Sequence, residues 1–88
     1  FNINIKEKDL FMITIYTKDD CQQCKMTKRL FDNANVTYKE INIDYETEYA
    51  EKLKELGFKA APVIETATDT WAGFQPAKIK AEIKLQSA

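Results

Sequence analysis

Hydrophobic positions repeat about every second residue in some segments and about every 3.6 residues in others, which predicts alternating strands and helices. The expected strands are 12–17, 36–43, 62–66 and 68–72. The expected helices begin at Cys21 and stop near 33–35, run from 46 to 56, and run from 76 to 85. Gly57 suits the position just after the second helix, and Pro76 suits the first residue of the third.

The last helical segment has two interpretations. Residues 77–85 alternate apolar and polar like a strand, but Ile79 and Ile83 are also four residues apart, as on one face of a helix. Their Ala, Lys and Glu content favours the helix. The predicted order is then β-α-β-α-β-β-α, an α/β domain in which a helical crossover makes the first two strands parallel. We expect a four-stranded mixed sheet with three helices.

Polar residues before the first two helices suggest how these helices begin. Asp20 is a favourable N-cap for the first helix, and Gln23 three residues later completes a capping-box pattern. Asp44 most simply caps the second helix. By their spacing, the residues expected in the core from these helices are Met26, Leu30, Phe31, Leu53 and Leu56.

The first eleven residues follow a different pattern. An alternating start gives way to a run of charges, and Met12 opens the first predicted strand. Because Lys6 and Glu7 can be encoded as AAG GAG, a ribosome-binding sequence, we expect 1–11 to be an extension of upstream or added origin. The domain itself is then 12–88. The alternative is that the extension forms an extra edge strand of the domain.

Composition narrows the possible functions. The chain has 88 residues, enough for one domain, and its 13 basic and 14 acidic residues leave a net charge of -1. That balance argues against a nucleic-acid or anionic-membrane partner, and the apolar runs are too short to span a membrane. Histidine is absent and only two glycines occur. His-dependent catalysis, His-based metal sites and a glycine-rich phosphate loop are therefore excluded.

The remaining chemistry lies in Cys21 and Cys24, which enclose two glutamines in a Cys-x-x-Cys pair. A bridge over so short a loop constrains the unfolded chain very little, so it adds little stability. We interpret the pair as a bond that opens and closes in a reducing compartment. On a helix, residues three apart approach to about 5–6 Å, which is within the range of a disulfide.

The two cysteines are expected to differ in reactivity. Cys21, at the helix start, would face unpaired N–H groups and the positive end of the helix dipole, which favour a thiolate. Nearby lysines act in the same direction and two aspartates oppose them, so we expect a moderate lowering of its pKa. Cys21 is the predicted nucleophile, and Cys24, on the inward side of the helix, is the predicted resolving cysteine.

Other uses of the pair remain open at this point. Zinc needs four ligands, so a zinc or iron–sulfur site would have to be shared with a second chain. The cysteines could instead be inert members of the core. The domain could also be a binding module without redox activity. We expect the chain to carry no metal or other cofactor.

Two segments resemble the NrdH-redoxins, which are small glutaredoxin-like proteins: the Cys-x-Gln-Cys pair and the Trp-Ala-Gly-Phe-Gln-Pro segment at 71–76. Further similar positions are 13–18, 28–29, 43–44, 57–58 and 62–63. The resemblance covers essentially all of 12–88. It implies the thioredoxin/glutaredoxin fold and a role as electron donor to class Ib ribonucleotide reductase.

The resemblance also implies which residues meet the substrate. Pro62 would be the cis proline of the fold, beside the cysteines, and Ala61 would offer backbone hydrogen bonds to an extended substrate strand. Trp71, Gly73 and Phe74 would contribute to substrate binding, with Phe74 favoured as the aromatic that faces the cysteines. From the residues alone, Pro62 would instead be a trans proline that opens a strand, and the two aromatics would be core residues.

The chain departs from the family in the same loop. Ala72, Gln75 and Ala77 stand where a serine, an arginine and an aspartate are usual, so the polar network of that loop is expected to be altered. Gln22 replaces a residue that is more often small and apolar. None of these changes touches the thiol chemistry.

The electron donor and the acceptor follow from the resemblance. The loop lacks the second glycine and the aspartate that hold the glutathione carboxylate in glutaredoxins, which implies reduction by thioredoxin reductase instead. The implied acceptor is the large subunit of class Ib ribonucleotide reductase. We expect a monomeric cytoplasmic redox carrier with protein-disulfide reductase activity and no nucleic-acid or membrane partner. A glutathione-dependent glutaredoxin is the alternative.

Overall fold

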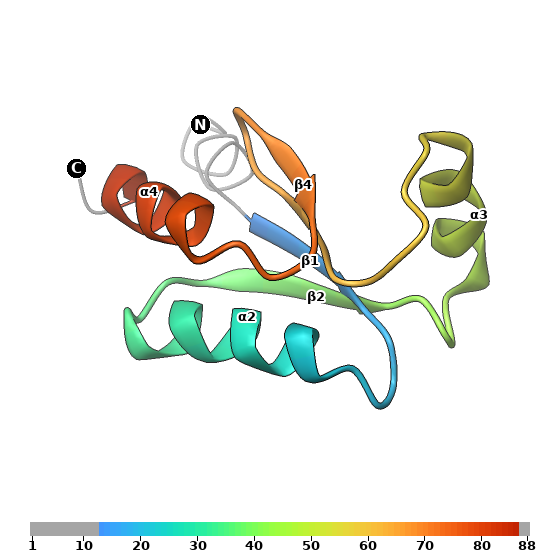
Figure 1. The fold of residues 1–88 in the computed structure, drawn as a ribbon, viewed down its shortest axis with the longest axis horizontal. Coiled ribbons are helices and arrows are strands. Elements are labelled where there is room, and N and C mark those ends of the chain that lie inside the picture. The colour runs from blue at the N-terminus through green and yellow to red at the C-terminus, as the bar shows by residue number, and fades with distance from the viewer. Residues whose placement is uncertain (1–12, 87–88) are drawn as a thin grey trace, which may run out of the picture.

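Strands and helices alternate through residues 13–86, the part of the chain that the computed structural model describes (Figure 1). The strands are β1 (Ile13–Thr17), β2 (Tyr38–Asn42), β3 (Val63–Glu65) and β4 (Thr70–Ala72). The helices are α2 (Gln22–Asn33), α3 (Thr47–Glu55) and α4 (Pro76–Gln86). This order confirms the predicted β-α-β-α-β-β-α, with the last segment helical and Pro76 as its first residue. The predicted extension at 1–11 lies outside the described residues and stays a prediction.

The four strands form one mixed sheet in the order β2-β1-β3-β4. β1 and β2 are parallel, with Thr17 beside Asn42, as their helical crossover requires. β3 is antiparallel to both of its neighbours. The register places Tyr16 beside Val63, so the C-terminal end of β1 and the N-terminal end of β3 meet at the same end of the sheet.

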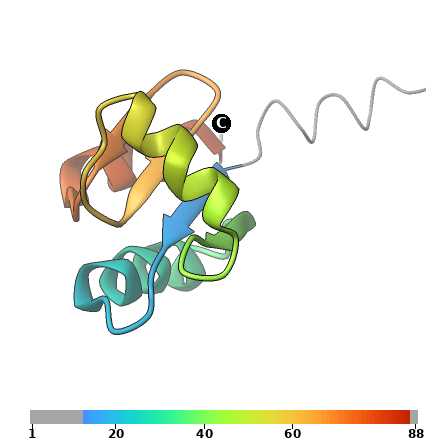
Figure 2. The ribbon, with the colours of Figure 1, turned by 90° about the vertical axis from the view of Figure 1, so that its right-hand side faces the viewer.

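Different helices cover the two faces of this sheet. α2 and α4 lie together on one face (Figure 1) and close over a core of Ile13, Ile15, Phe31, Ile64, Trp71 and Ile79. Leu30 packs against this core and Met26 is half-buried. α3 lies apart from the other two helices, nearest the viewer in Figure 2, and the ring of its Tyr49 is 6.0 Å from that of Tyr16.

The end of α2 explains why β2 starts later than predicted. Asn35 adopts a left-handed backbone with φ 57°, and the Val36 N–H donates to the Phe31 carbonyl at 3.0 Å. This pattern satisfies carbonyls of the last helical turn. Because residues 34–36 close the helix in this way, the strand begins only at Tyr38.

α3 ends in the same pattern. Gly57 has φ 94° and the Phe58 N–H donates to the Leu53 carbonyl at 2.9 Å, which confirms the predicted role of the glycine. Because the helix stops at Glu55, Leu56 lies beyond the stripe that faces the sheet and is 66% exposed. The prediction that Leu56 belongs to the core is therefore wrong, whereas Leu53 is buried.

The strands β3 and β4 are shorter than predicted because the turn between them takes up 66–69. The Thr66 N–H donates to the Asp69 carbonyl at 2.8 Å, and the Thr66 hydroxyl oxygen accepts the Asp69 N–H at 2.9 Å. These bonds close a tight hairpin, and the ladder resumes at Thr70.

Candidate redox site

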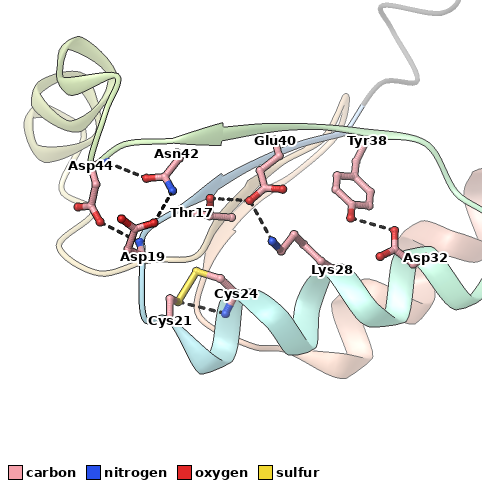
Figure 3. A network of polar contacts seen from close by, with 10 residues as sticks. All are labelled: Thr17, Asp19, Cys21, Cys24, Lys28, Asp32, Tyr38, Glu40, Asn42 and Asp44. Atoms are coloured by element: carbon pink, nitrogen blue, oxygen red, sulfur yellow. Dashed lines mark hydrogen bonds and ion pairs between the residues drawn. A yellow bond between two sulfur atoms is a disulfide. The ribbon is translucent and has the colours of Figure 1, made fainter.

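Cys21 and Cys24 form a disulfide at the start of α2, with their Cα atoms 5.2 Å apart (Figure 3). Cys21 is the N-cap residue, and its Sγ accepts the Cys24 N–H at 3.1 Å. Asp20, the predicted N-cap, instead occupies a left-handed turn with φ 53°. The prediction was wrong by one residue because the cysteine sulfur itself provides the capping acceptor, so the helix begins at Gln22.

The two sulfur-bearing residues differ in exposure. Cys24 is only 2% exposed and packs into the protein, whereas Cys21 is half-buried. A partner thiol therefore has access to the bond from the Cys21 side. The same Cys24 N–H that now meets the Cys21 sulfur would stabilise negative charge on that sulfur after reduction. This asymmetry supports the predicted order of attack, which stays a prediction.

A polar network holds the loop that leads to Cys21 (Figure 3). The Asp19 N–H donates to Asp44 Oδ2 at 2.8 Å, and Asn42 Nδ2 donates to Asp19 Oδ1 at 3.1 Å. The Tyr45 hydroxyl also donates to Asp19, and these two side-chain bonds, the tyrosine first, hold the pKa of Asp19 below its ordinary value. The network ties the turn before the disulfide to the turn after β2.

Asp44 was expected to cap α3, and this prediction is wrong. The N-cap of α3 is Glu46, which makes no side-chain capping bond, and the Asp44 carboxylate accepts the Asp19 N–H instead. Asp44 lies beside the loop that leads from β1 to Cys21 (residues 18–20, the redox loop). The sequence did not reveal this position because Asp19 and Asp44 are 25 residues apart. Only the parallel register of β1 and β2 brings the two loops together.

A second polar group lies one helical turn beyond Cys24. Glu40 Oε2 on β2 accepts both the Thr17 hydroxyl at 2.9 Å and Lys28 Nζ at 3.0 Å (Figure 3). Lys28 follows Cys24 by four residues, so the two side chains share one face of α2. The group therefore joins β1, β2 and α2, the helix that carries the disulfide (the redox helix), one turn beyond the buried cysteine.

The peptide bond between Ala61 and Pro62 is cis, as the resemblance implied. Because Val63 pairs with Tyr16, Pro62 lies at the end of the sheet where β1 leads into the redox loop. The Pro62 carbonyl accepts the Gly73 N–H at 2.8 Å, so the proline segment also holds the loop before α4. Ala61 is half-buried at this end.

That loop is also tied to the redox helix. Gln23 Oε1 accepts the Phe74 N–H at 3.0 Å, and this bond joins the two segments on which the family resemblance rests. The predicted capping-box role of Gln23 at the start of α2 is therefore wrong, because its side-chain oxygen accepts the Phe74 N–H. Gly73 allows the turn with φ 83°, and Gln75 Nε2 closes it onto the Ala72 carbonyl at 2.9 Å.

The two aromatics of this segment differ in position. Trp71 is 4% exposed within the core, and its indole nitrogen has no hydrogen-bond partner among the described residues. Lys78 Nζ lies 5.7 Å from the centre of its ring. Phe74 is half-buried and packs against the edge of the core. Phe74 is thus the more accessible of the two.

Two further properties concern metal ions and membranes. In residues 13–86, no three His, Cys, Asp or Glu side chains are grouped as metal ligands would be. Every helix in the same range is too short or too polar to cross a bilayer. The disulfide is thus the chemically distinctive group of the described part of the chain.

The parallel β-α-β unit, the cis proline and a Cys-x-x-Cys disulfide at a helix start define a dithiol redox protein of the thioredoxin/glutaredoxin fold. Residues 13–69 match the family model for Glutaredoxin. The chain is 43% identical to the glutaredoxin-like protein NrdH of Lactococcus lactis subsp. cremoris over 68 residues, which are 77% of this chain and 94% of that protein. It is 44% identical to the NrdH of Escherichia coli strain K12 over 64 residues, which are 73% of this chain and 79% of that protein.

Solved structures agree with this assignment. The NrdH-redoxin of Escherichia coli superposes with a TM-score of 0.79 at 41% identity, covering 81% of this chain and 93% of that chain. A glutaredoxin from Archaeoglobus fulgidus, at 21% identity and a TM-score of 0.72, shares the fold. The chain belongs to the glutaredoxin family, as an NrdH-type glutaredoxin-like redoxin with a redox-active Cys21–Cys24 pair.

Proposed function

We propose that this redoxin carries electrons from thioredoxin reductase to the disulfide of the class Ib ribonucleotide reductase large subunit. The observation that carries the proposal is the Cys21–Cys24 disulfide, in which Cys21 is half-buried and Cys24 is buried. The Escherichia coli NrdH-redoxin, which is 41% identical, has a thioredoxin-like activity profile. We place the reaction in the cytoplasm, with the chain acting as a monomer and residues 12–88 as the working domain.

The reaction is a pair of thiol–disulfide exchanges. The Cys21 thiolate of the reduced protein attacks the target disulfide, forming a mixed disulfide and releasing one target thiolate, which takes up a proton. Cys24 then loses its proton and attacks the Cys21 sulfur, releasing the second target thiol. The target gains two electrons and two protons, and the redoxin is left with the disulfide seen in the structure. Thioredoxin reductase returns two electrons to that disulfide.

The substrate segment is proposed to lie along Ala61 and Pro62 at the end of the sheet where β1 leads into the redox loop. An extended peptide there would add its backbone beside the cis proline, as strand-addition partners do. Trp71, Gly73 and Phe74 are proposed to border the same region. The Phe74 side chain is the accessible member, while the other two shape the loop that carries it.

The test is NADPH oxidation with insulin as the disulfide substrate, driven either by thioredoxin reductase or by glutathione with glutathione reductase. Turnover with thioredoxin reductase alone is expected, and the ribonucleotide reductase subunit is then the next substrate. Turnover with glutathione alone would identify a glutathione-dependent glutaredoxin. Inactivity in both assays would indicate a binding module without redox function.

A further inference from the structure

The Gln23 side chain of α2 is hydrogen-bonded to the backbone of the loop before α4. Its Oε1 accepts the Phe74 N–H at 3.0 Å, although the two residues are 51 apart in sequence. The preceding N–H, from Gly73, is bound to the Pro62 carbonyl at 2.8 Å. Gln23 itself is exposed and stands between the two cysteines. A side chain of the redox motif is thus an internal ligand of the neighbouring loop.

The position held by this amide oxygen is one that favours an anion. The loop leads directly into α4, which begins at Pro76, and the N-terminal end of a helix carries partial positive charge. A carboxylate would meet the Phe74 N–H with a charge-assisted bond, which is stronger than the bond to a neutral amide. Gln23 belongs to the same chain as the Phe74 N–H, so it competes with a free carboxylate for this donor without paying the entropy cost of association.

We propose that Gln23 is a specificity-determining residue that excludes small anionic thiols from the Cys21–Cys24 disulfide. While the Gln23 oxygen holds the Phe74 N–H and the Pro62 carbonyl holds the Gly73 N–H, neither of these two adjacent donors is open to the carboxylate of such a thiol. A protein partner, which binds over a larger surface, does not depend on these donors. The inference rests on the proposed function, because it explains why a protein reductase and not a small thiol serves as donor.

Glutathione is the probe for this proposal. Two glutathione molecules supply two electrons: the first forms a mixed disulfide with the protein, and the second releases the reduced pair and glutathione disulfide. The assay follows reduction of hydroxyethyl disulfide, with NADPH and glutathione reductase regenerating glutathione. The KM for glutathione is measured for the wild type, Gln23→Ala, Gln23→Glu and the matched control Gln22→Ala, whose exposed side chain also lies between the cysteines.

Removing the Gln23 side chain should let glutathione bind beside the disulfide. Gln23→Ala is expected to lower the KM for glutathione about tenfold, the effect of one hydrogen bond to a charged group. Gln23→Glu keeps an acceptor and adds a negative charge, so it should stay at or above the wild-type KM. Gln22→Ala should match the wild type. Hydrogen exchange at the Phe74 amide should speed up in Gln23→Ala but not in Gln22→Ala, which ties the kinetic change to the bond.

Two results would overturn the proposal. One is the absence of any gain in Gln23→Ala, whether wild-type activity with glutathione is high or undetectable. The other is an equal gain in Gln23→Ala and Gln22→Ala, which would indicate a general loosening of the helix start. The proposed function is tested separately, by wild-type turnover with thioredoxin reductase. Inactivity there would reject the proposed donor and leave the glutathione comparison to decide the role of Gln23.

Discussion

Lys28, on the helix face that also carries the buried Cys24, forms an ion pair with Glu40 of β2, 3.0 Å from Nζ to Oε2. The same carboxylate oxygen accepts the hydroxyl of Thr17, which is 1% exposed. The pair is partly solvated, so its own contribution is small. The Thr17 hydroxyl is buried, so removal of its acceptor lowers the free energy of unfolding more than loss of the ion pair does.

Glu40 is therefore expected to matter more for stability than its lysine partner. Glu40→Ala should lower the free energy of unfolding by about 1–2 kcal/mol, because it leaves the Thr17 hydroxyl buried without an acceptor. Lys28→Met should cost below about 1 kcal/mol. Urea unfolding measures both. Glu40→Gln is the control, since its amide oxygen can still accept the hydroxyl; equal losses for Gln and Ala would show that the Thr17 bond is not the source.

A second prediction concerns the acidity of the loop before Cys21. The pKa of Asp19 is lowered chiefly by the Tyr45 hydroxyl, so this bond stabilises the fold above the ordinary carboxyl pKa of about 3.9. The stabilisation is lost as the pH falls through the lower folded pKa. Tyr45→Phe should raise the Asp19 pKa toward its ordinary value in a carboxyl NMR titration. Asp69, whose pKa is lowered mainly by Lys78, should not change in this variant.

A third prediction concerns Tyr16 on the opposite face of the sheet. Burial, followed by the charge and the hydrogen bond of Glu65, raises its pKa to about 12. The protonated form is thus favoured on folding, and this stabilisation is complete below about pH 10 and is lost as the pH rises to about 12. In a spectrophotometric titration, Glu65→Gln should move one tyrosine step downward but not fully to 10, because burial remains.

Tyr38 provides the internal reference for that titration. Its pKa is also raised to about 12, by burial and then by its bond to Asp32, and neither cause involves Glu65. One step near 12 should therefore persist in Glu65→Gln. Loss of both high steps would contradict the assignment of Glu65 to Tyr16 alone.

The order of elements was predictable because each depends on local residues. The hydrophobic period marked the earlier strands and helices, the Ala, Lys and Glu content decided the last helix, and Gly57 and Pro76 marked helix boundaries through backbone preferences that act locally. The cysteine pair was likewise visible, since its spacing alone permits the bond. Leu56 was misplaced because a helical stripe does not show where the helix ends, and the last turn was one residue shorter than the stripe.

The contacts around the disulfide were not predictable in the same way. Capping preferences favour Asp20 over a cysteine, but the backbone there turns left-handed and places the Cys21 sulfur at the cap. Asp44 and Gln23 have partners 25 and 51 residues away. Their local sequence suits a capping role, and only the assembled sheet reveals that they hold the loops on either side of the redox pair.

The order of attack by the two cysteines is the prediction that bears most directly on mechanism. Cys21 is half-buried and Cys24 is buried, so an incoming disulfide should bond to Cys21 and be released by Cys24. Cys24→Ser should therefore accumulate a mixed disulfide with the ribonucleotide reductase large subunit, visible as a higher band on a non-reducing gel. Cys21→Ser should form no such band and should lose disulfide-reducing activity. A band in Cys21→Ser with none in Cys24→Ser would reverse the roles of the two cysteines.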